Sequence, residues 1–121
     1  MGSDDYATDK WLMKLFEFYY DPCPLNHDPD IDLLNEPWHK HAYSGVYINP
    51  PYSNPLPWVK KAIQTKKDYP GLNVVMLLKH DSSTAWFRLL QENGSHFLFP
   101  YGRLKFNTGR SAPFPSVLVI L

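Results

Sequence analysis

Proline is the residue that most constrains this chain, because it occurs 12 times in 121 residues. Each proline fixes its own φ angle and lacks a backbone N–H, so it interrupts helices and the interior of sheets. The chain is therefore expected to form short helices and strands joined by fixed turns. Its length suits one hydrophobic core and no repeat divides it, so residues 1–121 are expected to form a single domain.

The composition is that of a folded protein without a strong overall charge. Hydrophobic residues make up 44% of the chain, and 12 basic residues balance 12 acidic ones. A nucleic-acid contact would therefore need a local basic patch. The aliphatic run at residues 74–78, which no other run in the chain exceeds, is far shorter than the roughly 20 residues that cross a bilayer. Cys23 is the only cysteine, which fits a reducing compartment, so an intracellular protein without a membrane partner is expected.

Apolar periodicity predicts helices that alternate with strands. Helical spacing predicts a first helix over residues 9–18, capped by Thr8, and a second over residues 55–67. A third helix is expected to begin after a cap at Ser82 or Ser83 and to end at Asn93-Gly94. Short β-prone runs predict strands at residues 17–20, 45–48, 73–78, 96–99 and 116–121, and the continuous apolar run at residues 73–78 indicates a strand covered on both faces. Pro55 and Pro57 lie where the helix over residues 55–67 is expected to start. A polar loop covers residues 25–44, with one helical turn near residues 31–34. This alternation predicts an α/β layer with a largely parallel sheet.

Three tryptophans fall on the apolar stripes of these helices. They are Trp11, Trp58 and Trp86. Large aromatic side chains at helical spacing usually pack in a core, so all three are expected to be buried.

The most informative residues, Asn49-Pro50-Pro51-Tyr52, directly follow the predicted strand at residues 45–48. Open α/β sheets bind ligands at the carboxyl ends of their strands. The prolines stiffen the backbone, so the Pro50 carbonyl and the Asn49 side-chain oxygen are expected to converge on one point. Two acceptors there would bind both N–H groups of a planar amino group, as in adenine, cytosine or glutamine, and favour the pyramidal form whose lone pair attacks. Tyr52 would stack on the ring, which contributes about 1–3 kcal/mol per base.

Five stretches in order carry a resemblance to a known family. They are residues 8–15, residues 20–26 (YDPCPLN), residues 47–54 with residues 57–59, residues 102–106 (GRLKF) and residues 111–116 (SAPFPS). Together they resemble the phage-type DNA N6-adenine methyltransferases, which use S-adenosylmethionine. The set covers nearly the whole chain and is more specific than the tetrapeptide alone.

The resemblance implies methyl transfer from S-adenosylmethionine to adenine N6 in DNA. It also implies a compact Rossmann-like methyltransferase sheet with flanking helices, shortened relative to the usual fold. Carried over to this chain, Asn49, Pro50, Pro51 and Tyr52 would form the catalytic motif, and the target base would have to leave the duplex stack. If the chain is virus-encoded, it would act in the cytoplasm of the host cell.

The chain departs from the broader methyltransferase pattern after its first predicted strand. A glycine-rich turn there would let the backbone approach the cofactor, yet residues 21–26 contain no glycine. Asp21, at the end of this strand, is the expected polar contact to S-adenosylmethionine, with Thr8 and Asn26 in the same crevice.

Basic residues in two places are expected to bind DNA. Arg103, Lys105 and Arg110 lie in a turn-rich segment between two predicted strands, the kind of loop that contacts phosphate. Lys79 ends the central predicted strand and borders the crevice with His80 and Asp81. Since so small a domain leaves little room for target recognition, a homodimer or an added partner would supply the rest of the surface.

Two alternative functions stay open. A glutamine amide is as planar as the adenine amino group, so the tetrapeptide also fits a protein glutamine N-methyltransferase. A shortened, non-catalytic DNA-binding relative fits the missing glycine turn, although it need not keep both acceptors. Cys23, His27, His39 and His41 have borderline spacing for a metal site, but histidines in surface loops are common and no metal is expected.

Overall fold

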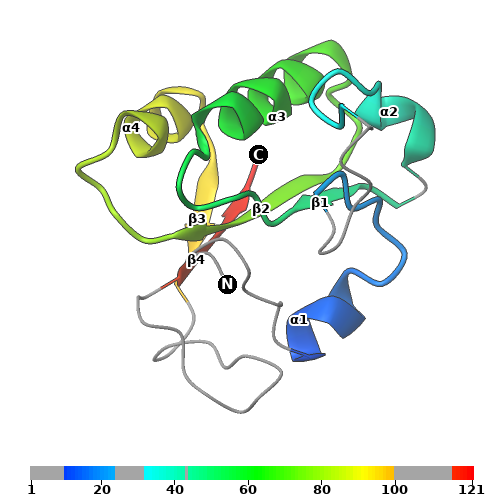
Figure 1. Ribbon diagram of the computed structural model, residues 1–121, viewed down its shortest axis with the longest axis horizontal. Helices are drawn as coiled ribbons and strands as arrows, with labels where there is room; N and C mark the ends of the chain where they lie inside the picture. Colours follow the sequence, from blue (N-terminus) through cyan, green and yellow to red (C-terminus); the bar gives the residue numbers. More distant parts are fainter. Residues whose placement is uncertain (1–9, 24–31, 43, 100–115) are drawn as a thin grey trace.

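The computed structural model describes residues 10–23, 32–42, 44–99 and 116–121, and shows helices packed on a four-stranded sheet (Figure 1). The helices are α1 (Lys10–Leu15), α2 (Trp38–His41), α3 (Leu56–Asp68) and α4 (Ala85–Glu92). The strands are β1 (Val46–Ile48), β2 (Val74–Lys79), β3 (His96–Leu98) and β4 (Ser116–Ile120). The α/β class is confirmed. No helix among these residues is long and apolar enough to span a membrane.

The sheet is mixed, so the prediction of a largely parallel sheet was wrong. Its order is β1-β2-β4-β3, in which β1 and β2 are parallel and β4 is antiparallel to both of its neighbours. The reversal comes from β4 alone, because β3 points the same way as β2. Parallel neighbours need a long crossover, usually a helix, whereas antiparallel neighbours do not. The sequence between β3 and β4 has no helical pattern, which favours the reversed strand.

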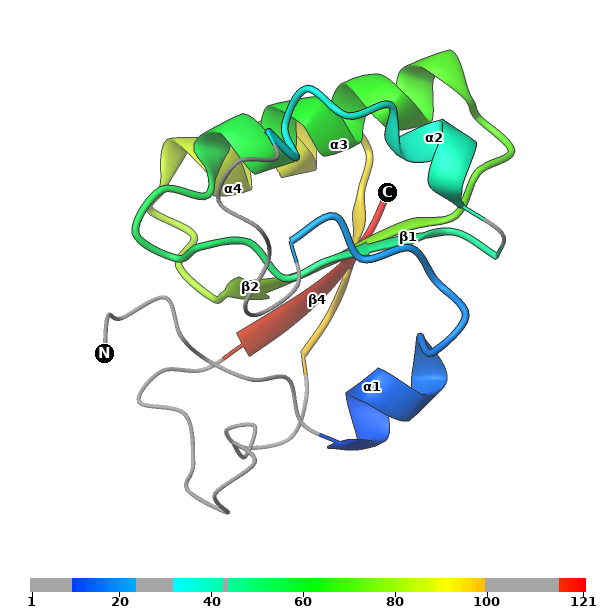
Figure 2. The ribbon, with the colours of Figure 1, turned by 45° about the vertical axis from the view of Figure 1, so that its right-hand side comes forward.

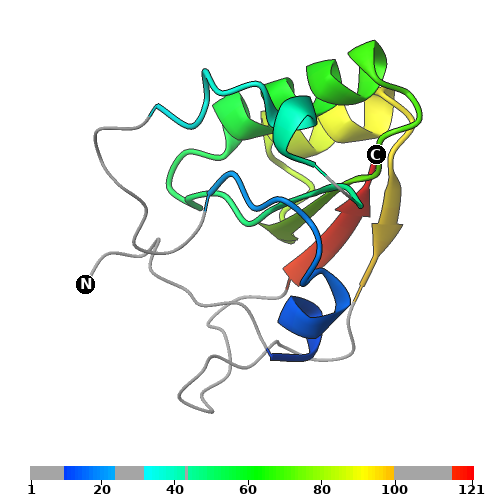
Figure 3. The same ribbon diagram turned by 90° about the vertical axis from the view of Figure 1, so that its right-hand side faces the viewer.

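Side chains fill both faces of the sheet. Helices α3 and α4 cover one face, and α1 lies on the opposite face (Figures 2 and 3). Along β2, Val74 and Met76 belong to the larger core with α3 and α4, whereas Val75 and Leu77 belong to a smaller cluster with Leu12 of α1. This alternation explains why the strand is apolar from Val74 to Leu78, and it confirms the prediction of a strand covered on both faces.

Helix α1 is shorter than predicted and turns only part of its apolar stripe inward. Leu12 is fully buried, whereas Trp11 is 49% exposed and Leu15 is 62% exposed. A helix of fewer than two turns brings few side chains onto the sheet. The prediction of a buried Trp11 was therefore wrong, whereas Trp58 and Trp86 are buried as predicted.

Three local features also differ from the prediction. Thr84, rather than Ser82 or Ser83, caps α4, because its side-chain oxygen accepts a 3.3 Å hydrogen bond from the Phe87 N–H. The predicted strand at residues 17–20 pairs with β1 through a single bridge. The helical turn in the long polar segment is α2, which lies after the predicted position.

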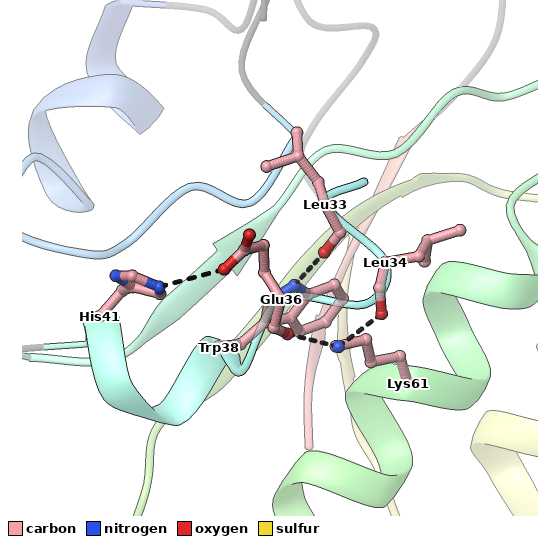
Figure 4. Close-up of polar contacts among 6 residues, drawn as sticks. All are labelled: Leu33, Leu34, Glu36, Trp38, His41 and Lys61. Atoms are coloured by element: carbon pink, nitrogen blue, oxygen red, sulfur yellow. Dashed lines mark hydrogen bonds and ion pairs between the residues drawn. The ribbon is translucent and has the colours of Figure 1, made fainter. Parts of the chain in front are cut away.

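Lys61 of α3 holds the segment that leads into α2 (Figure 4). Its ammonium group donates hydrogen bonds to the carbonyl oxygens of Leu34 and Glu36, and lies 5.0 Å from the centroid of the Trp38 ring. The Trp38 indole N–H donates to the Leu33 carbonyl at 2.8 Å. The segment is thus fixed on α3 by one cation and one buried aromatic ring.

Candidate active site

Three parallel segments end at the same edge of the sheet. Tyr20 forms a parallel bridge with Val46, in which the Tyr47 N–H donates to the Tyr20 carbonyl at 2.9 Å. Strand β2 lies on the other side of β1. Across this edge the order is therefore Asp21, then Asn49, then the end of β2 at Lys79. Ligands of open α/β sheets bind at such an edge.

The predicted catalytic tetrapeptide follows β1 and leads into a turn over residues 51–54. The Pro51 carbonyl accepts a hydrogen bond from the Asn54 N–H at 3.2 Å, which closes the turn. Pro50 is buried, whereas Asn49 and Tyr52 are half-buried. The Tyr52 hydroxyl donates a 2.7 Å hydrogen bond to Asn49 Oδ1. No sequence pattern predicts this bond, which joins the two side chains expected to meet the base.

A pocket of about 120 Å³ opens beside this turn. Its lining comes from the turn, the end of β2 and the starts of α3 and α4, and consists of Tyr52, Pro55, Leu78, Lys79, Asp81, Thr84 and Trp86. The volume is several times the roughly 30 Å³ that one water molecule occupies in the liquid. The pocket therefore has room for a group larger than a single water molecule.

The pocket brings together residues that the sequence reasoning had kept apart. Tyr52 and Lys79 were predicted for the site, and Asp81 was placed on the same crevice. Trp86 was assigned only to the core, and the sequence pattern did not single out Thr84. The first turn of a helix that follows a central strand lies at the carboxyl edge, and this signal would have indicated both residues.

The rim of the pocket carries both signs of charge. Lys79 is exposed. The Ser83 hydroxyl and backbone N–H donate to Asp81 Oδ1 at 2.6 and 3.1 Å, and these bonds lower the pKa of Asp81, with Lys79 and His80 adding smaller effects. Asp81 is therefore an anion at neutral pH, next to the lysine that was predicted to contact DNA.

Asp21, the predicted cofactor contact, lies on the other side of the tetrapeptide. Its Oδ1 accepts a 2.9 Å hydrogen bond from the Cys23 N–H. Burial raises the pKa of Asp21, and the hydrogen bond from Cys23 acts in the opposite direction. The role of Asp21 stays a prediction.

The other predicted site residues lie outside the described residues. They are Thr8, Asn26, Arg103, Lys105 and Arg110.

Two of the histidines considered for a metal site contact other side chains, and His27 lies outside the described residues. His39 stacks on Tyr69 with the ring centroids 4.1 Å apart, and His41 stacks on Tyr20 at 4.9 Å. Within residues 10–23, 32–42, 44–99 and 116–121, no three histidine, cysteine or acidic side chains gather around a possible metal position.

Comparison with known proteins identifies the family. The family model described as DNA N-6-adenine-methyltransferase (Dam) matches residues 4–115. A DNA N-6-adenine-methyltransferase of Haemophilus phage HP1 is 32% identical over 79% of this chain and 61% of its own length. A protein of the same name from Escherichia phage T1 is 34% identical over 64% of this chain and 31% of its own length. No solved structure matches the chain significantly.

The chain thus spans less than two thirds of each of these two phage proteins. The family match nevertheless extends over most of the chain and includes the tetrapeptide, Asp21 and the residues that line the pocket. This chain belongs to the DNA N-6-adenine-methyltransferase (Dam) family.

Proposed function

We propose that this chain is a DNA adenine-N6 methyltransferase that uses S-adenosylmethionine. The observation that carries the proposal is the position of the segment from Asn49 to Tyr52, which lies between Asp21 on one side and the pocket on the other. Both phage relatives are named for the same reaction, which supports the proposal. We further propose that the chain forms a shortened methyltransferase domain and acts in the cytoplasm of an infected host cell.

The target adenine would occupy the pocket. Leu78 and Trp86 offer an apolar wall to a ring, whereas Lys79, Asp81 and Thr84 offer polar groups to its edge. Such a mixture is typical of pockets for small planar ligands. An adenine inside a duplex cannot reach the pocket, so the base has to be flipped out at a cost of a few kcal/mol.

Asn49 and Tyr52 would hold the base at the mouth of the pocket. The Asn49 amide oxygen and the Pro50 carbonyl accept the two amino hydrogens, and the Tyr52 ring stacks on the base. Aligning the amino nitrogen with the methyl group is the main source of rate, because two oriented reactants avoid the entropic cost of meeting in solution. The stiff proline pair maintains this alignment.

Asp21 is chemically suited to the donor. A carboxylate accepts hydrogen bonds from the ribose hydroxyls and from the ammonium group of an amino-acid moiety, and S-adenosylmethionine carries both. The Cys23 N–H orients the carboxylate. When bound, S-adenosylmethionine supplies a methyl group on a positively charged sulfur. Thr8 and Asn26 remain proposed contacts to the donor, and Arg103, Lys105, Arg110 and Lys79 remain proposed contacts to DNA.

The test is transfer of a labelled methyl group from S-adenosylmethionine to DNA. Adenine-containing duplex and single strands should be labelled, whereas strands in which every adenine is replaced by thymine should not. Label that appears on glutamine side chains of a protein substrate, but not on DNA, would favour the glutamine alternative. Absence of saturable donor binding in calorimetric titration, together with retained DNA binding, would favour the non-catalytic alternative.

A further inference from the structure

The Tyr52 hydroxyl donates to the very oxygen that is expected to receive the adenine amino group. The distance between Tyr52 Oη and Asn49 Oδ1 is 2.7 Å, which is typical of a well-formed O–H···O hydrogen bond. The two residues are three apart in a segment that Pro50 and Pro51 stiffen, so the contact is built into the tetrapeptide.

The side-chain amide of asparagine has two chemically opposite ends. Its oxygen accepts hydrogen bonds and its NH₂ group donates them, and a half-turn about the last side-chain torsion exchanges the two. Only the oxygen is useful toward an incoming amino group, because two NH₂ groups that face each other both offer donors. A bond from Tyr52 to Oδ1 opposes this half-turn.

The bond from Tyr52 is compatible with a bond from the substrate. An amide oxygen has two lone pairs, so it can accept an O–H from one side and an N–H from the other. Hydrogen bonds in such a chain also polarise one another in a site of low dielectric, which strengthens both.

We propose that Tyr52 is a positioning residue for Asn49, with its hydroxyl keeping the amide oxygen turned toward the base. This role is separate from stacking, which needs only the ring. The inference rests on the proposed function, because it concerns the same amino group and the same reaction.

The experiment removes the hydroxyl and keeps the ring. Tyr52→Phe should lower kcat for methyl transfer to adenine DNA by about threefold to tenfold, the range expected for one net hydrogen bond. The KM for DNA should change little, because stacking is retained. Tyr69→Phe is the matched control, because it also removes a tyrosine hydroxyl that makes a hydrogen bond. That hydroxyl lies 3.0 Å from His39 Nε2, at the far end of α3 from the candidate site. Its kcat should equal that of the wild type.

A double-mutant cycle shows whether the hydroxyl acts through Asn49. In an Asn49→Ala background, where a labelled donor still detects weak transfer, Tyr52→Phe should have no further effect on kcat. An equal loss in both backgrounds, or an unchanged kcat in Tyr52→Phe alone, would overturn the inference while leaving the methyltransferase intact. If the wild-type chain labels no adenine-containing DNA under any condition, the proposed function is wrong, and the inference about Tyr52 is wrong with it.

Discussion

A methyl group at Gly45 would lie 2.6 Å from the Asn73 carbonyl oxygen, closer than real side chains approach. The same oxygen accepts the Val46 N–H at 2.8 Å, and the Gly45 carbonyl accepts the Tyr20 N–H at 2.9 Å. Gly45 is thus packed between the two segments that lie on either side of β1. Its missing side chain allows β1 to pair with both neighbours, and these pairings position the candidate site at the opposite, carboxyl end of the strand.

Replacing Gly45 by alanine should therefore destabilise the protein. The added carbon meets backbone, which yields less readily than the end of a side chain, and overpacking of this kind costs about 1–3 kcal/mol. Urea unfolding measures the loss. Gly71→Ala is the matched control, because a Cβ there meets nothing within 4 Å and its φ angle is not positive. Equal stability of the two variants would contradict the prediction.

The pKa of Asp21 predicts how stability depends on pH. Burial raises this pKa above its ordinary value of 3.8, so in mildly acid solution the folded state holds the proton more tightly than the unfolded chain does. The stabilising contribution of the protonated form is complete below pH 3.8 and is lost as the pH rises through the raised pKa. Asp21→Asn is neutral at every pH and keeps an acceptor for the Cys23 N–H.

Asp21→Asn should therefore be more stable than the wild type at pH 7, and the difference should shrink toward pH 4. Urea unfolding at a series of pH values tests this. If the variant is less stable than the wild type at pH 7, the contacts of the Asp21 carboxylate stabilise the folded state by more than its burial destabilises it, which contradicts the prediction.

Local sequence patterns predicted most of the elements but not how the last strand pairs. The continuous apolar run of β2 predicted a strand covered on both faces, and the proline-rich start of α3 predicted where that helix begins. The direction of β4 depends on which neighbour it meets, and this is decided by contacts distant in sequence. The inward turn of α1 likewise depends on how it docks, so Leu12 is buried while Trp11 is not.

The candidate site divides in the same way. The tetrapeptide could be placed from sequence because a strand end, two prolines and an aromatic residue are local features. The opposite wall of the pocket comes from the end of β2 and the start of α4, so Thr84 and Trp86 join Tyr52 only through the packing of the sheet. The hydrogen bond between Tyr52 and Asn49 depends on side-chain torsions that no sequence pattern specifies.

Lys61 should stabilise the fold through its backbone contacts. Lys61→Met keeps most of the aliphatic stem but removes the donors to the Leu34 and Glu36 carbonyls. A hydrogen bond from a charged group contributes about 1.5–3 kcal/mol, so a loss within that range is expected in thermal or urea unfolding. Lys60→Met is the control, because Lys60 is the neighbouring residue on the same helix and its side chain is exposed. An equal effect at both lysines would mean that the contacts with the segment before α2 contribute nothing measurable.

Lys79 should contribute to DNA affinity through a phosphate. Neutralising one phosphate contact reduces the slope of log affinity against log salt by about 1. Lys79→Gln should show that change together with weaker binding, as measured by fluorescence anisotropy across a salt series. Lys67→Gln, in the last turn of α3, makes the same change in net charge away from the pocket and should leave the slope unchanged. Parallel slopes for the wild type and Lys79→Gln would remove Lys79 from the DNA surface.

Asn49→Ala tests the tetrapeptide most directly. Losing an oriented group that stabilises the reacting atoms typically lowers kcat by about 10² or more. The fold should be retained, because Asn49 is only half-buried and the turn is closed by the bond between the Pro51 carbonyl and the Asn54 N–H. Methyl transfer from a labelled donor measures activity, and circular dichroism on heating measures the stability of the fold. Asn35→Ala is the control, because Asn35 is exposed and lies outside the site, and this variant should match the wild type in both measurements. If Asn49→Ala methylates adenine at the wild-type rate, its amide oxygen does not orient the amino group, and the acceptor must be sought among the polar groups of the pocket, Asp81 first.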